Sequence, residues 1–190
     1  MIIAASLFLW IKYFTVFLTT HAAAGILISH YVRSPIEVFG LAFASHFVLD
    51  FVPHGDEQLY HDEEWRSGRR YRRVAIINAI DVTVMAAMAL WAIANNPLPN
   101  SHLMLIGILG SIIPDFLSHL FPVVHKRLSW LFLVRWLYGL TKPTGLRYLV
   151  RAQNWFHDAL HHDIIRSDIS FQSGLIMQVL LVILFLGLAR

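Results

Sequence analysis

The sequence predicts an all-α protein, built as a bundle of membrane-spanning helices in a single domain, residues 1–190. Of its 190 residues, 57% are hydrophobic and only 14% are charged, whereas a typical soluble domain carries about 25% charged residues. Five stretches are apolar enough to cross a bilayer, and positive charge is distributed very unequally between their two ends. The low charge content, the apolar stretches and the unequal distribution of positive charge favour an integral membrane protein over a soluble one.

The five predicted spans follow from length and hydropathy, since a bilayer core needs about 20 mostly apolar residues per helix. A further apolar stretch, Met1–Ile11, precedes the first span, and the third and fourth spans stop before prolines. We expect the spans at Tyr13–Val32, Ile36–Val52, Val74–Ala94, His102–Phe121 and Leu175–Leu188.

The segment between the fourth and fifth spans, residues 125–172, contains an apolar and aromatic part, Leu128–Leu140, with Arg135 inside it. We expect a cytoplasmic or interfacial helical segment here rather than a sixth crossing. Aromatic side chains suited to the membrane boundary are Tyr138, Trp155 and Phe156.

Alternation of five crossings places 13 of the 15 Lys and Arg residues on one side, and only Arg33 and Arg190 on the other. By the positive-inside rule this predicts a membrane protein with its N-terminus in the cytoplasm and its C-terminus outside; the resemblance given below implies that the membrane is the bacterial inner (plasma) membrane. An alternative is a signal peptide over Met1–Gly25, although it lacks the basic start that such peptides have.

The amino-acid composition limits which partners and which metal ligands the chain can have. The net charge of +3 is small and one-sided, which indicates membrane orientation and no nucleic-acid partner. Without cysteine there are no disulfides and no thiolate metal sites, so the 11 histidines are the obvious nitrogen ligands.

Histidine and aspartate recur four residues apart inside the apolar stretches, as His46 with Asp50 and Asp115 with His119. This spacing puts both side chains on one helix face. Each ionisable group costs roughly 2.5–3.5 kcal/mol in a bilayer, so we expect these groups to be functional. Further candidates at the same cytoplasmic depth are His21 and Asp81, with His54 and Asp56 beside the second span and His157, His161 and His162 farther along.

Imidazole and carboxylate ligands suit zinc, and also manganese or iron, and the number of groups leaves room for two ions. Such a site predicts a metal-dependent hydrolase that cleaves a phosphoester or lipid-like substrate with metal-activated water. An unligated Asp or His then moves the proton, and the catalytic candidates are Asp50, Asp115 and His54. Membrane lipids are the expected partners, and the sequence leaves the substrate and the oligomeric state open.

Other interpretations stay open at this point. The buried pairs can form a polar network that only stabilises the bundle, although such bonds average about 0.6 kcal/mol in membranes. A metal or proton carrier is a further alternative, but its outer end offers few polar groups beyond His30, Glu37 and His102. His54 with Asp56 fits a solvated turn, and the histidines at 157–162 fit an amphipathic helix. The arginines at 66–73 suit anionic lipid or a substrate phosphate.

Several short motifs resemble a known family. The chain has Thr20-His21, then a helix from His46 to Asp50 that leads into Pro53-His54-Gly55-Asp56, then Gly110-Ser111-Ile112-Ile113-Pro114-Asp115. These motifs, within the first 120 residues, resemble small bacterial inner-membrane proteins described as membrane-bound metal-dependent hydrolases. The resemblance implies a metal site built from these residues. In that family the aspartate motif often continues as Asp-x-Asp-His. In this chain Asp115 is followed by Phe116, Leu117, Ser118 and His119, so the second aspartate of the motif is missing.

Overall fold

The computed structural model describes residues 17–52, 69–95, 100–117, 146–159 and 169–189, with residues 136 and 139. Within these ranges the regular structure is helical, which confirms the predicted all-α class. The helices are α2 (Leu18–Tyr31), α3 (Pro35–Asp50), α4 (Arg69–Ala94), α5 (Asn100–Asp115), α8 (Leu146–Ala159) and α9 (Phe171–Leu188).

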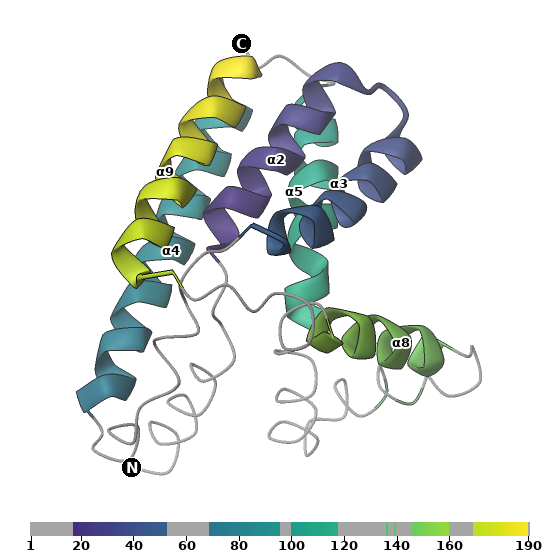
Figure 1. The fold of residues 1–190 in the computed structure, drawn as a ribbon. Helices are drawn as coiled ribbons and strands as arrows, with labels where there is room; N and C mark the ends of the chain where they lie inside the picture. The colour runs from purple at the N-terminus through teal and green to yellow at the C-terminus, as the bar shows by residue number, and fades with distance from the viewer. Residues whose placement is uncertain are drawn as a thin grey trace.

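Helix α2 is the centre of the bundle. It packs against α3, α4, α5 and α9 (Figure 1), and ten of its fourteen residues are buried. Its middle is Ala22-Ala23-Ala24-Gly25, and such small side chains allow neighbouring helices to approach closely. An apolar core surrounds this part of α2 and comprises Ala22, Ala23, Ile26, Met88, Ala92, Met104 and Ile108.

Glycines set the closest contacts of α5. Gly107 packs directly on the backbone of Gly25 in α2, so that a Cβ atom on either residue would overlap the other helix. One turn later, a Cβ atom on Gly110 would lie 2.8 Å from the carbonyl oxygen of Phe39 and 3.1 Å from Cβ of Ala42, both in α3. The glycines of α5 therefore hold α2 and α3 against the same helix.

The turn between α2 and α3 fixes which ends of the helices meet. Ser34 caps α3, and Pro35 occupies its first turn, where the missing N–H costs nothing. The hydroxyl of Tyr31 donates a 2.8 Å hydrogen bond to the carbonyl oxygen of Leu188 at the end of α9. Because this turn reverses the chain, the start of α2 and the end of α3 lie at the same end of the bundle (Figure 1).

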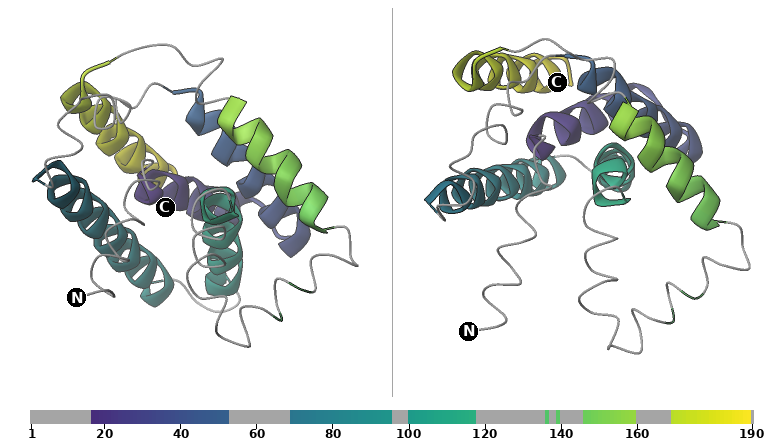
Figure 2. Two further views of the ribbon diagram at one scale, coloured as in Figure 1. Left: turned by 90° about the horizontal axis from the view of Figure 1, so that it is seen from below. Right: turned by 60° about the horizontal axis from the view of Figure 1, so that its bottom comes forward.

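Helix α8 lies at this end of the bundle, beside α3 and the end of α5 (Figures 1 and 2). The side chain of Gln153 donates to the carbonyl oxygen of Pro114 in α5 at 3.3 Å. The ring of Phe156 packs edge-on to Phe47 of α3, with centroids 5.1 Å apart. Helix α8 thus falls within the predicted interfacial segment, residues 125–172, whereas most of Leu128–Leu140 lies outside the described residues.

The prediction of five membrane spans is confirmed only in part. In the described ranges, two helices are long and apolar enough to cross a membrane, α4 over Ile76–Ala94 and α9 over Phe171–Leu188. Helices α2, α3 and α5 contain 14, 16 and 16 residues, and 16 helical residues extend only about 24 Å of the roughly 30 Å bilayer core. The remaining parts of the predicted first and fourth spans, residues 13–16 and 118–121, lie outside the described residues.

Candidate metal centre

The candidate site lies where three helices meet at one end of the bundle. His21 comes from the first turn of α2, His46 and Asp50 from the last two turns of α3, and Asp115 from the end of α5. The exposed fractions of these residues are 1%, 0%, 0% and 4% in that order. Residues far apart in the sequence therefore form one buried cluster of two imidazoles and two carboxylates.

The polar atoms of the cluster face one another. Nε2 of His46 lies 3.2 Å from Oδ2 of Asp50 and 3.6 Å from Oδ1 of Asp115, and Nε2 of His21 lies 3.5 Å from Oδ1 of Asp50. The two imidazole rings stack with centroids 4.2 Å apart. Each of His21, His46 and Asp50 offers a ligand atom within 4.8 Å of the other two. These three buried residues form a group that can hold a metal ion.

The spacing of these atoms suits a small divalent metal. Zinc binds imidazole nitrogen and carboxylate oxygen at about 2.0–2.2 Å. In a tetrahedron with such bonds, neighbouring ligand atoms lie about 3.4 Å apart. The two histidine–Asp50 separations, 3.2 and 3.5 Å, are close to this value, although they reach different oxygens of that carboxylate. Two nitrogens and a carboxylate within 4.8 Å of one another are a donor set that can hold such a metal.

A hydrogen bond determines which ring nitrogen of His46 carries a proton. Its Nδ1 lies 2.7 Å from the carbonyl oxygen of Ser111, and because a carbonyl only accepts, Nδ1 must carry the proton. In the neutral ring Nε2 is then an acceptor, yet it faces carboxylate oxygens of Asp50 and Asp115, which are also acceptors. A positive charge between these atoms, either a second ring proton or a metal ion, removes the repulsion. In many metal sites a backbone carbonyl orients a ligating histidine by accepting a hydrogen bond from its other ring nitrogen.

The segment Gly110–Asp115 of α5 builds one wall of the centre. Gly110 allows α3 to approach, the carbonyl of Ser111 orients His46, and the carboxylate of Asp115 reaches the cluster. Pro114 lies inside the helix, and a π-helical turn follows at residues 116–117. Such irregular turns are frequent at functional sites. This segment is one of the three motifs that carry the sequence resemblance.

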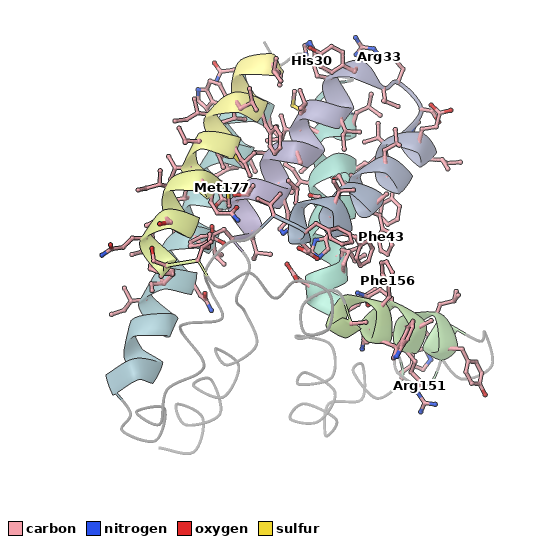
Figure 3. The ribbon with its side chains drawn as sticks, viewed as in Figure 1. His30, Arg33, Phe43, Arg151, Phe156 and Met177 are labelled. Carbon is pink, nitrogen blue, oxygen red and sulfur yellow. The ribbon has the colours of Figure 1, made fainter. Side chains whose placement is uncertain are left out.

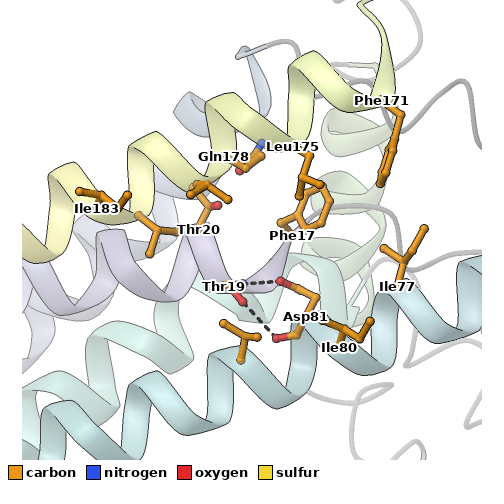
Figure 4. A pocket seen from close by; sticks show the side chains of 13 residues that line it. Phe17, Thr19, Thr20, Ile77, Ile80, Asp81, Phe171, Leu175, Gln178 and Ile183 are labelled. Carbon is orange, nitrogen blue, oxygen red and sulfur yellow. Dashed lines mark hydrogen bonds between the residues drawn. The ribbon is translucent and has the colours of Figure 1, made fainter.

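Asp81 has a different contact from the one predicted. Its carboxylate accepts hydrogen bonds from the backbone N–H of Leu18 at 2.7 Å and of Thr19 at 3.3 Å, at the first turn of α2 (Figure 4). The hydroxyl of Thr19 donates in return to the carbonyl oxygen of Asp81. Phe17 at the N-cap position provides no side-chain cap. Asp81 therefore caps α2 from α4, and it does not join the group formed by His21, His46 and Asp50.

The other predicted ligands are not placed in the centre. His54, Asp56, His119, His161 and His162 lie outside the described residues, and of His157 the structure describes only its backbone position in α8. His30 and Arg33 lie at the opposite end of the bundle from α8 (Figure 3). The four site residues that the structure brings together are thus His21, His46, Asp50 and Asp115.

Ser111, Thr20 and Gln178 were not predicted as site residues from the sequence. Ser111 acts through its backbone carbonyl, which gives no signal in side-chain chemistry, although it belongs to the Gly110–Asp115 motif. Thr20 and Gln178 are polar and buried, and both line a pocket between α4 and α9. A glutamine near the start of the predicted fifth span was the available signal for Gln178.

Comparison of the chain with protein-family models, with curated proteins and with solved structures finds no match. Fold and site therefore define the class directly. Over the residues that the structure describes, the protein is helical, with two helices long and apolar enough to span a membrane and a buried histidine–aspartate cluster able to hold a metal ion.

Proposed function

We propose that this chain is a membrane-embedded, metal-dependent hydrolase of the bacterial inner membrane, acting on a phosphoester or lipid-like substrate. His21, His46 and Asp50 hold the metal, for which zinc fits best and manganese or iron are alternatives. When bound, the metal lowers the pKa of water so that it attacks at neutral pH. This assignment agrees with the family that the sequence motifs resemble.

The observation that carries the proposal is the environment of His46. Its proton is held on Nδ1 by the Ser111 carbonyl, and its Nε2 faces two carboxylates at 3.2 and 3.6 Å. Two carboxylates and an imidazole nitrogen thus converge on one buried point, and such a donor set suits a divalent metal ion.

Asp115 is the candidate for proton transfer. It contacts Nε2 of His46 at 3.6 Å but is not part of the tightest group of ligand atoms. Its carboxylate comes from the end of α5, where Gln153 of α8 docks one residue earlier. A carboxylate beside a metal-activated water is well placed to accept its proton.

The core above the cluster favours an enzyme over a carrier. Between the cluster and the opposite ends of the helices, most of the described buried side chains are aliphatic or methionine, among them Ile26, Met88 and Met104, and the buried polar ones are Ser29 and Ser101. An ion path across the membrane needs polar groups along its length. In the described part of the bundle, the site is therefore closed on the side away from α8.

The surfaces of α4 and α9 support a membrane location. In the most apolar 18-residue stretch of each helix, only 17% (α4) and 11% (α9) is buried inside the protein. Large aliphatic residues such as Leu90 and Leu180 are exposed. Apolar surfaces of this extent are rare on soluble monomers. A bilayer covers them without cost, which supports the predicted bundle of spanning helices.

The test is metal content and hydrolysis by the purified protein in detergent. We expect close to one or two zinc, manganese or iron ions per chain and chelator-sensitive hydrolysis of bis-p-nitrophenyl phosphate or a fluorescent phospholipid. Asp50→Asn should lose both, because it removes a ligand from the centre of the cluster. The matched control is Glu37→Gln, which neutralises the exposed carboxylate at the other end of α3. Protein free of metal, or activity indifferent to chelators, would refute the proposal.

A further inference from the structure

A second site lies on the other side of α2 from the metal cluster. It is a pocket of about 430 Å³ between α4 and α9, with the start of α2 at its base (Figure 4). This volume falls within the range of roughly 300–1,000 Å³ found for small-molecule sites. The metal centre makes no use of this pocket.

The walls of the pocket are aliphatic and aromatic. Ile80 and Val84 line it from α4, and Leu175, Val179 and Ile183 line it from α9. All five are exposed by 39% or more, so the pocket lies among side chains that face the bilayer in the proposed membrane protein. Its lining suits a hydrocarbon chain and can be reached from the lipid phase.

Two buried polar atoms face this apolar space. Gln178 and Thr20 line the pocket, with exposed fractions of only 5% and 2%. Oε1 of Gln178 and Oγ1 of Thr20 have no hydrogen-bond partner among the described residues. A buried polar group without a partner costs about 1–3 kcal/mol. Both oxygens are covered by neighbouring atoms, so a ligand hydroxyl completes these hydrogen bonds when the two side chains turn toward it.

From these observations we propose that the pocket binds one hydrocarbon chain of a lipid that carries a hydroxyl group. The ligand's hydroxyl donates to Oε1 of Gln178 and accepts from the hydroxyl of Thr20, while the chain lies along Val179 and Ile183. An engineered cavity of about 150 Å³ binds benzene, so this volume suits a chain on the order of 15 carbon atoms.

The pocket and the metal centre share one structural element. Thr20 faces the pocket, and the next residue, His21, belongs to the metal cluster. Asp81, which caps this turn of α2, also lines the pocket. That the bound lipid is the substrate rests on the proposed hydrolase activity, whereas its binding rests only on the proposed membrane location.

The probe is a monoacylglycerol with a diazirine in its acyl chain, incorporated with the full chain into phosphatidylcholine vesicles. After irradiation, mass spectrometry locates the label. We expect it on pocket-lining residues of α4 and α9. Val179→Trp, which fills the pocket, should lower labelling about tenfold, whereas Leu180→Trp should not, since Leu180 is equally apolar and exposed but lies outside the pocket.

The hydrogen bonds are tested separately, with variants that disturb packing less. Gln178→Leu should lower labelling by the monoacylglycerol about fivefold, as expected for one lost hydrogen bond. It should not affect a diazirine-bearing alkane without hydroxyls. Gln172→Leu, at an exposed position in the first turn of α9, is the control.

Labelling spread evenly over the lipid-facing residues, or equal in Val179→Trp and Leu180→Trp, would overturn the proposal. So would labelling that appears only after deletion of the apolar residues 2–11, because the chain's own N-terminus would then be the occupant. The same measurement on Asp50→Asn separates the two proposals. Labelling there should equal wild type, even if the hydrolase proposal fails.

Discussion

Gly25 of α2 and Gly107 of α5 meet backbone to backbone, with no room for a side chain on either. His21 lies one turn before Gly25, and Asp115 lies two turns after Gly107. This contact therefore sets how closely the helices that carry two of the site residues approach. In a membrane, where the hydrophobic effect does not drive helices together, such close packing is a main source of association.

The Gly25 contact leads to the first prediction. Gly25→Ala should destabilise the protein by about 1–3 kcal/mol, because the added methyl group overlaps the backbone of Gly107. Gly40→Ala is the control, since nothing lies within 4 Å of the position that its added Cβ atom would take, and it should be neutral or stabilising by up to about 1 kcal/mol. Thermal unfolding of the detergent-solubilised protein measures both. Equal effects would mean that the two helices do not touch there.

Metal should stabilise the folded chain. A ligand at 100 times its dissociation constant adds about 2.7 kcal/mol to the free energy of unfolding. Zinc should therefore raise the Tm of wild type by roughly 5–10 °C, and removal by chelator should reverse this. His46→Gln and His21→Gln should show no zinc-dependent rise, whereas His102→Gln, at an exposed position in the first turn of α5, should behave as wild type. A full rise in either cluster variant would exclude that histidine as a ligand.

Asp81 is predicted to act in stability rather than in metal binding. Asp81→Leu removes the acceptor for the N–H groups of Leu18 and Thr19, which should lower the free energy of unfolding by about 1–3 kcal/mol. Metal bound per folded chain should stay at the wild-type value. Asp81→Asn keeps one acceptor oxygen and should have a smaller effect. Loss of metal in Asp81→Asn with unchanged stability would restore Asp81 as a ligand.

Membrane topology can be tested cleanly because the chain has no cysteine. Glu37→Cys and Arg151→Cys place single thiols at exposed positions, one at the start of α3 and one on α8. We expect a membrane-impermeant maleimide to label Glu37→Cys in intact cells and Arg151→Cys only after permeabilisation. The reverse pattern would invert the predicted orientation, and labelling of both in intact cells would argue against it.

The anchoring of α8 gives a further prediction. Phe156→Ala removes the ring that packs on Phe47 and should detach α8 from the end of α3, close to Asp50. We expect faster proteolysis within α8 and reduced hydrolysis with metal content unchanged. Trp155→Ala is the matched control, because Trp155 is 72% exposed. If both variants digest at the wild-type rate, the Phe47 contact does not hold α8.

Much of the site could be predicted from the sequence, because its signals are local. His46 and Asp50 are four residues apart on one helix, and in apolar surroundings such groups carry a cost that marks them as functional. On the same grounds His21 and Asp115 were predicted as ligands near one end of the bundle. The helical class followed from length and hydropathy alone. Spans were predicted less well, since α2, α3 and α5 are shorter helices than their apolar stretches indicate.

What the sequence by itself determined is therefore the helical class and the identity of the buried polar residues, because periodicity and burial cost are properties of each segment. Only the tertiary structure decided their partners. Asp81 was predicted as a ligand from its depth, but the packing of α4 against α2 gives it the backbone of Leu18 and Thr19 instead. The backbone carbonyl of Ser111 orients His46 only because Gly110 lets α3 approach. Such contacts depend on how helices cross, and no single segment encodes a crossing.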